Sequence, residues 1–196
     1  MVIWIAENKA LLLEILAVIF GVAYIVLAAK NKISCWLFGI IAALLSIWLF
    51  IEHAQLYAEA FSYCFYVMAG FYGWYSWQNQ VKESTIYQHP LKNHALLIII
   101  GGILSVGFYY LVTTIFTDAA RPLIDSFTTI FSFIATYLTI KKWLNNWIYW
   151  IVIDVVTTYL YVSRELYLYA GLMAVYSVIA LYGYLQWKKL NVVKVD

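Results

Sequence analysis

Asp154 is the residue of this sequence best suited to binding chemistry. It lies near the middle of an apolar stretch, Asn145–Tyr161, and no apolar stretch of the chain contains a Lys or Arg that could pair with it. A carboxylate at mid-bilayer depth costs about 2.5–3.5 kcal/mol on insertion scales, so we expect it to be retained for a function. Trp147 and Trp150 precede it at helical spacing. A carboxylate beside indole faces favours a planar cation or an aminated heteroaromatic ring.

The helical register adds hydroxyl groups to the same face. Thr157, Thr158 and Tyr161 follow Asp154 at intervals of three, four and seven residues. Such a stripe gains nothing from lipid, and we expect it to face the interior of a helix bundle. The residues predicted to contact a ligand are Trp36, Glu59, Tyr63, Tyr66, Trp147, Trp150, Asp154, Thr158, Tyr169 and Tyr176.

Several of these features also have a purely structural explanation. Hydroxyl groups in the stretch Ile124–Ile140 could make interhelical hydrogen bonds, worth under about 2 kcal/mol each. Four tryptophans at the ends of apolar stretches fit an interfacial aromatic belt, namely Trp4, Trp77, Trp143 and Trp187. Glu14 and Asp125, near the ends of stretches, could favour helix N-termini or form a negative outer vestibule.

Composition places the chain in a membrane. Of 196 residues, 65% are hydrophobic and only 11% are charged, and the mean hydropathy is +0.83. No soluble domain of this length could bury so much apolar surface. The net charge of +2 gives no reason to expect nucleic-acid binding. The motifs H-E-x-x-H and G-x-S-x-G do not occur and the three His lie in connections, so we expect neither an enzyme nor a metal site, and no cofactor.

Seven stretches are long and apolar enough to cross a bilayer as helices, so the predicted fold class is an all-α integral membrane protein. They are Leu11–Ala29, Ser34–Ile51, Leu56–Trp77, Ala95–Phe116, Ile124–Ile140, Asn145–Tyr161 and Leu166–Trp187. With the N-terminus outside, nine Lys fall in inner segments, and the outer segments hold only Lys9, Arg121 and Arg164. This asymmetry predicts an outer N-terminus and a cytoplasmic C-terminus in a bacterial inner membrane.

The chain also repeats itself at a spacing of about 111 residues. Leu12, Glu14, Ile19, Phe20, Leu27, Lys30 and Trp36 recur as Leu123, Asp125, Ile130, Phe131, Leu138, Lys141 and Trp147. The repeat predicts one membrane domain in three parts: a three-helix unit in residues 1–81, a loop and linker helix in 82–120, and a second three-helix unit in 121–196. Parallel repeats of this kind are typical of transporters with a substrate site near mid-membrane.

The run Trp147-x-x-Trp150-x-x-x-Asp154 resembles the W-x-x-W-x-x-x-N/D motif of the PnuC family of bacterial vitamin transporters. The segments KISCWLFGI (Lys32–Ile40) and LYAEAFSYCFYVMAGFYGWYSW (Leu56–Trp77) resemble the first repeat of that family. The resemblance covers nearly the whole chain. It implies a 3+1+3 helix arrangement like a full-length SWEET carrier, a homotrimer, and facilitated diffusion with trapping of the substrate by a cytoplasmic kinase.

Within the family, the resemblance points to the thiamine-transporting branch, PnuT. Nicotinamide riboside members typically carry Asn at the last motif position, where this chain has Asp154, and tend to carry Asn in the second span, where it has Ala42. The predicted function is therefore thiamine uniport. A transporter of nicotinamide riboside or riboflavin from the same family is the alternative, and a coupled transporter or a ligand-binding receptor remains open.

Overall fold

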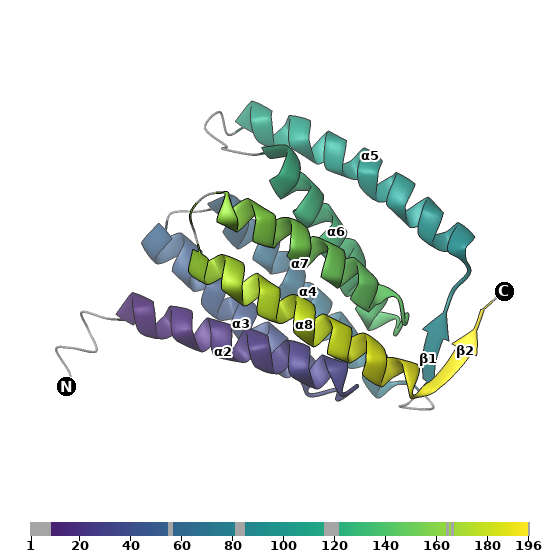
Figure 1. The fold of residues 1–196 in the computed structure, drawn as a ribbon. Helices are drawn as coiled ribbons and strands as arrows, with labels where there is room; N and C mark the ends of the chain where they lie inside the picture. The colour runs from purple at the N-terminus through teal and green to yellow at the C-terminus, as the bar shows by residue number, and fades with distance from the viewer. Residues whose placement is uncertain are drawn as a thin grey trace. The chain divides into compact units, whose positions relative to one another are not determined.

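A computed structural model describes residues 9–54, 57–80, 85–115, 122–163, 165 and 167–195, except for the side chains of 53, 54, 57–61, 115 and 168. The described elements are helices α2 (Lys9–Ala29), α3 (Cys35–Leu49), α4 (Tyr57–Gln78), α5 (Leu91–Ile115), α6 (Pro122–Ile140), α7 (Asn146–Val162) and α8 (Tyr167–Lys188), the π-helix η1 (Phe50–Ala54), and strands β1 (Thr85–Gln88) and β2 (Asn191–Lys194) (Figure 1).

The seven α-helices correspond one to one with the seven predicted spans, and their ends agree to within a few residues. Within the described residues, five helical stretches are by themselves long and apolar enough to cross a membrane: Lys9–Ala29, Cys35–Glu52, Leu91–Thr114, Pro122–Ile140 and Tyr169–Lys188. The other two helices differ for a local reason. Helix α7 has only 17 residues and contains Asp154, and α4 is rich in Tyr and Ser.

The chain divides into two compact units, Met1–Glu83 and Ser84–Asp196. In the first unit, α3 packs against both α2 and α4. In the second unit, consecutive helices pack in the order α5, α6, α7 and α8, and β2 follows directly after α8. The complete 3+1+3 arrangement of a SWEET-like carrier remains a prediction, as does its division at residues 81 and 120.

The two units nevertheless contain the same turn. Asn31, after α2, and Lys142, after α6, both have φ near 53°, and their positions differ by 111. The hydrogen bonds also correspond, because the N–H of Lys32 donates to Leu27 at 3.0 Å and the N–H of Trp143 donates to Leu138 at 3.0 Å. This pattern is the Schellman motif that ends a helix. The repeat found in the sequence is therefore also present in the backbone of each unit.

The same tryptophan–glycine contact also holds two helices together in each unit. A Cβ built on Gly73 of α4 would lie 2.4–2.6 Å from three ring atoms of Trp36, and one built on Gly183 of α8 would lie 2.8 Å from three ring atoms of Trp147. Only a residue without a side chain lets the helix backbone approach the indole so closely. We call each contact a Trp–Gly contact.

A second tryptophan completes each Trp–Gly contact. Trp77 meets the ring of Trp36 edge-on, with centroids 5.4 Å apart and planes at 86°, and Trp187 meets Trp147 at 5.3 Å and 87°. Trp77 and Trp187 are buried. The interpretation of these two residues as members of an interfacial belt is therefore wrong, because both are packed inside their units.

The two strands were not predicted from the sequence. β1 and β2 pair in parallel with Thr85 opposite Asn191, and both lie in the second unit. β1 also bonds to the connection between α6 and α7, since the N–H of Tyr87 donates to Lys142 at 2.9 Å and the N–H of Leu144 donates to Tyr87 at 2.8 Å. Strands of four residues leave almost no periodic signal, and this pairing joins segments about 100 residues apart.

Two histidines reinforce the connection between β1 and α5. The ring of His89 stacks on Trp143 with centroids 3.5 Å apart and planes at 18°, and that of His94 meets Trp143 edge-on at 5.6 Å. The side chain of Asn93 lies 3.3 Å from Nδ1 of His89. These contacts fix the start of α5 against the connection between α6 and α7.

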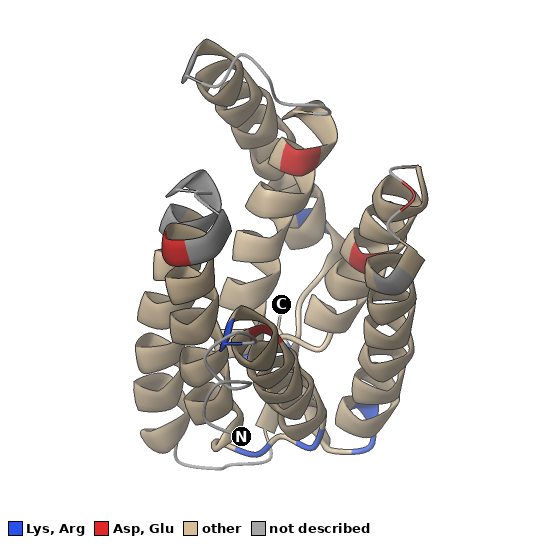
Figure 2. Ribbon diagram, turned by 90° about the vertical axis from the view of Figure 1, so that its left-hand side faces the viewer, with Lys and Arg blue, Asp and Glu red and all other residues tan. Residues whose placement is uncertain are grey.

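Charged residues are scarce along the helices and concentrate in the connections. Figure 2 shows helices that are almost entirely tan, with most of the blue segments in or beside the links between elements. Among the described residues of the second unit, the lysines lie at the start of α5, the end of α6, and the end of α8 with the segment that follows: Lys92, Lys141, Lys142, Lys188, Lys189 and Lys194. This distribution agrees with the charge pattern of the sequence, while the side of the membrane that each end faces remains a prediction.

The Trp–Gly contact predicts a large difference between two glycines of one helix. Gly183→Ala places a methyl group against the Trp147 ring and should destabilise the protein by about 1–3 kcal/mol. Gly171→Ala on the same helix meets no atom within 4 Å and should leave stability unchanged or raise it. Thermal unfolding of the two purified variants in detergent measures the difference, and equal melting temperatures would contradict the contact.

Stability should also depend on the protonation of His89. Burial lowers the pKa of His89 below its ordinary value of 6.5, and the nearby His94 lowers it further. A lowered folded-state pKa means that the stabilisation is present above the unfolded-state pKa and is lost as the pH falls through the folded-state value. The melting temperature should therefore fall from about pH 8 to about pH 5. His89→Gln should reduce this dependence, and an unchanged slope in that variant would exclude His89 as its source.

Candidate functional site

Helix α7 carries the predicted motif and separates two faces clearly. Trp147, Ile153 and Asp154 are buried, whereas the opposite face is exposed. The exposed residues are Ile148, Val152, Val155, Tyr159 and Val162. The spacing of three and four residues between them is that of one helix face. The prediction that the motif residues face the interior and not lipid is therefore confirmed for Trp147 and Asp154.

Asp154 is buried without a complete set of partners. Only 5% of its surface is exposed, and its Oδ2 atom has no hydrogen-bond partner among the described residues. The nearby hydroxyl of Thr158 does not supply one, because it donates to the backbone carbonyl of Asp154 at 2.7 Å. A buried polar atom without a partner is costly and is typical of a site that binds something.

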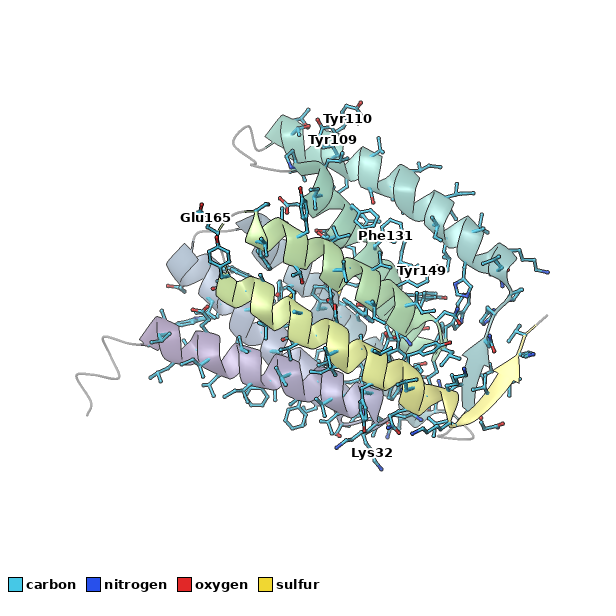
Figure 3. All side chains as sticks on the ribbon, viewed as in Figure 1. Lys32, Tyr109, Tyr110, Phe131, Tyr149 and Glu165 are labelled. Carbon is cyan, nitrogen blue, oxygen red and sulfur yellow. The ribbon has the colours of Figure 1, made fainter. Side chains whose placement is uncertain are left out.

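Trp150 lies one turn before Asp154 and is only partly buried. Its ring packs against a cluster formed by Phe131, Ala135 and Ile153, with Phe127, Ile134 and Tyr149 at the edge. Figure 3 labels Phe131 and Tyr149 of this cluster. The indole N–H donates to the hydroxyl of Thr139 on α6 at 3.3 Å. The edge of this ring is therefore bonded to protein, while part of its surface remains accessible for stacking.

Trp147 and Trp36 are placed differently. Only 1% of Trp147 is exposed, and its ring is covered by Gly183 and Trp187. Trp36 has the equivalent environment in the first unit. This packing supports a structural role for both residues. Their contact with a ligand remains a prediction that the observed packing does not favour.

The remaining predicted residues are divided between the two units. Tyr169 is exposed, with its ring 5.7 Å from that of Tyr161, and Tyr176 is partly buried; both lie in the second unit with Asp154. Tyr63 and Tyr66 belong to the first unit, where their rings meet edge-on at 5.4 Å. The side chain of Glu59 lies outside the described residues. Convergence of the first-unit residues on Asp154 remains a prediction.

Thr139 is one of the hydroxyl-bearing residues of Ile124–Ile140 for which interhelical hydrogen bonds were predicted, and its bonds to α7 confirm that interpretation, whereas sequence reasoning missed Asn146. The hydroxyl of Thr139 lies 3.0 Å from Oδ1 of Asn146, and the side-chain amide of Asn146 donates to the carbonyl of Trp143 at 2.7 Å. A comparison of equivalent positions in the two repeats could have identified both residues, because both positions are polar in the second repeat alone. At the positions 111 residues earlier, Thr139 and Asn146 correspond to the small residues Ala28 and Cys35.

The first unit also lacks counterparts of Trp150 and Asp154, two of the residues predicted to contact a ligand. Trp150 corresponds to Gly39 and Asp154 to Ala43. At these four pairs of positions, the second repeat carries the larger or more polar residue. The arrangement of Asp154 and Trp150 is a buried acceptor one helical turn from an accessible indole, which suits a flat ligand that is positively charged or rich in N–H donors. No group of three or more His, Cys, Asp or Glu that could hold a metal occurs among the residues described.

Comparison with known proteins gives a consistent result. The family model described as "Nicotinamide mononucleotide transporter" matches residues 11–189. Relatives named nicotinamide riboside transporter PnuC include one from Escherichia coli K12, 24% identical over 89% of this chain and 84% of its own length. Another, from Neisseria mucosa, is 28% identical over 89% of this chain and 71% of its own length.

The fold is also found in a solved protein. The structure described as the crystal structure of the vitamin B3 transporter PnuC aligns with a TM-score of 0.73 and 22% sequence identity, over 97% of this chain and 86% of that one. The fold prediction is thereby confirmed at the level of the transporter fold.

The Oδ2 atom of Asp154, which has no partner among the described residues, leads to a prediction about stability. Asp154→Leu replaces the buried polar group by an apolar one of similar size and should stabilise the protein, by about 1–3 kcal/mol, while abolishing ligand binding. Thr157→Val is the matched control, because the Thr157 hydroxyl already bonds to the carbonyl of Ile153 at 2.8 Å within the same helix. A melting temperature of Asp154→Leu below that of Thr157→Val would show that Asp154 has a stabilising partner.

Proposed function

The chain belongs to the nicotinamide mononucleotide transporter family, and from this premise we propose that it carries nicotinamide riboside across a bacterial inner membrane. The relatives described above bear the name of nicotinamide riboside transporters, and the match extends over most of their length. Together these findings favour this substrate over thiamine, the substrate predicted from the sequence.

The observation that carries the proposal is the buried carboxylate of Asp154 beside Trp150. Nicotinamide riboside contains a flat pyridinium ring with one positive charge, an amide and ribose hydroxyls. The carboxylate would offset the charge or accept hydrogen bonds from the hydroxyls and the amide, each charge-assisted bond contributing about 1.5–3 kcal/mol. The accessible part of the Trp150 indole would stack on the pyridinium ring and add a cation–π attraction.

The same carboxylate argues against the mononucleotide for which the family is described. A phosphate group would bring negative charge close to Asp154, which is itself an acid and is buried. The described lysines of this unit lie at helix ends and in the following segments and not beside Asp154. Like charges in a poorly solvated site repel strongly, so the nucleoside without phosphate is the better substrate.

Thiamine stays as the second candidate because of one specific residue. Asp154 takes the place of the Asn that nicotinamide riboside members typically carry, and an aminopyrimidine is a good donor to a carboxylate. Riboflavin is neutral and gives a buried carboxylate less to offset.

We further propose that transport is facilitated diffusion. In the described part of α7, Asp154 has Thr158 as its polar neighbour one turn away, and that hydroxyl is engaged with the backbone, so this helix places no free proton carrier there. In this proposal the lysine-rich ends face the cytoplasm, with the N-terminus outside, and a cytoplasmic kinase traps the substrate. A homotrimer is the expected assembly.

Proteoliposomes containing the purified protein test the substrate. We expect saturable uptake of labelled nicotinamide riboside, weaker inhibition by thiamine, and none by nicotinamide mononucleotide or riboflavin. Asp154→Leu, which leaves no side-chain acceptor at this position, should raise the half-saturating concentration of the riboside by about tenfold or more, because a charge-assisted bond is lost. Thr157→Val serves as the matched control.

The outcomes separate the candidates. Uptake of thiamine with no competition from the riboside would replace the first substrate by the second, and binding without flux would indicate a receptor. Accumulation above the external concentration in vesicles without a kinase would contradict facilitated diffusion. Equilibration without a proton or sodium gradient would support it.

A further inference from the structure

A buried hydrogen-bond network joins α6 to the proposed stacking residue on α7. The hydroxyl of Thr139 accepts from the indole N–H of Trp150 at 3.3 Å and lies 3.0 Å from Oδ1 of Asn146 and 2.9 Å from the carbonyl of Ala135. Asn146 is held in turn, because its amide donates to the carbonyl of Trp143 at 2.7 Å. Thr139 and Asn146 are 1% and 0% exposed, so water does not compete for these bonds.

The first unit shows what the same positions look like without this network. There, the ring of Tyr24 on α2 fills the space over Gly39 on α3, where a Cβ would lie 2.9 Å from the ring. In the second unit the sizes are exchanged, since Ala135 stands at the position of Tyr24 and Trp150 at that of Gly39. The small residue on α6 makes room for the large residue on α7. Ala135 therefore leaves space for the Trp150 indole, and the hydrogen bond to Thr139 determines how this ring is oriented.

We infer that Thr139 and Asn146 are positioning residues, which fix the Trp150 indole by its N–H and so direct its accessible face toward the ligand bound at Asp154. The inference rests on the proposed function, because it assigns the orientation of a residue of that same site. An indole can turn about its side-chain torsions, and each orientation that does not stack lowers ligand affinity. The Thr139 hydroxyl donates its one proton to either the Ala135 carbonyl or Oδ1 of Asn146 and accepts from the indole N–H, so this bond selects one orientation of the ring.

Three conservative variants on α6 test the inference. Thr139→Val keeps the shape and removes the hydroxyl, and it should raise the half-saturating concentration of nicotinamide riboside by roughly three- to tenfold, the range expected for one hydrogen bond. Thr139→Ser keeps the hydroxyl and should restore most of the affinity. Thr136→Val is the matched control, one turn away on α6 and equally buried, because its hydroxyl bonds only to Ser132 of its own helix among the bonds observed, at 2.8 Å.

A double-mutant cycle distinguishes positioning from a general effect on helix packing. Trp150→Phe keeps a ring but removes the N–H, so Thr139→Val should cause no further loss in that background, whereas a packing defect would cause the same loss in both. The indole N–H resonance of Trp150 supplies a readout that needs no ligand. In ¹⁵N-labelled protein, this resonance is identified by its absence in Trp150→Phe, and it should shift in Thr139→Val but not in Thr136→Val.

The results separate this inference from the proposed function. Failure of the wild-type protein to transport or bind the riboside would refute the proposed function, and the resonance would still decide whether Thr139 holds the indole. An unshifted resonance, equal losses in Thr139→Val and Thr136→Val, or additive losses in the cycle would each overturn the positioning role.

Discussion

The close approach of a tryptophan ring to a glycine is the constraint on which the rest of the structure depends. In each unit the indole lies so near the glycine that a single additional carbon could not be placed between the two helices. This contact sets the distance between α3 and α4 and between α7 and α8. Because all atoms of a helix move together, the contact also determines where the other residues of α7 lie. Asp154 is two turns further along the helix whose start Trp147 fixes.

Helix α7 is held from two sides by two tryptophans of the same motif. Trp147 packs toward α8 through Gly183, and Trp150 bonds to α6 through Thr139. The two residues look equivalent in the sequence, three positions apart and of the same type. Their environments separate the roles, since a fully enclosed ring stabilises the unit and a partly accessible one can meet a ligand. Asp154, which has neither a charge partner nor a complete set of hydrogen bonds among the described residues, lies on the helix that both contacts hold in place.

The helices were predictable from the sequence because length and apolar composition determine them almost locally, and all seven lie where the hydropathy placed them. The position of Asp154 inside its unit was predictable for the same reason, since one turn of a helix decides which face a residue shares. Contacts between segments far apart were not predictable. The pairing of β1 with β2 and the burial of Trp77 and Trp187 depend on partners that no local pattern identifies, and a tryptophan at a helix end can as well face lipid. The choice between thiamine and nicotinamide riboside rested on two positions, Asp154 and Ala42, and two side chains do not specify a whole ligand.

The divergence of the two repeats leaves a carboxylate at only one of the two equivalent positions, 43 and 154. The repeated three-helix unit would allow an acid at both equivalent positions, but the first repeat has Ala43 where the second has Asp154. A second buried carboxylate would double the cost of desolvation and would leave one negative charge unmatched beside a ligand with a single positive charge. The exchange of Tyr24 and Gly39 for Ala135 and Trp150 follows the same logic, because one ring face is sufficient to stack on one side of a flat ligand. Both repeats therefore keep the Trp–Gly contact, while Trp150 and Asp154, the residues proposed to bind the ligand, occur in the second repeat alone.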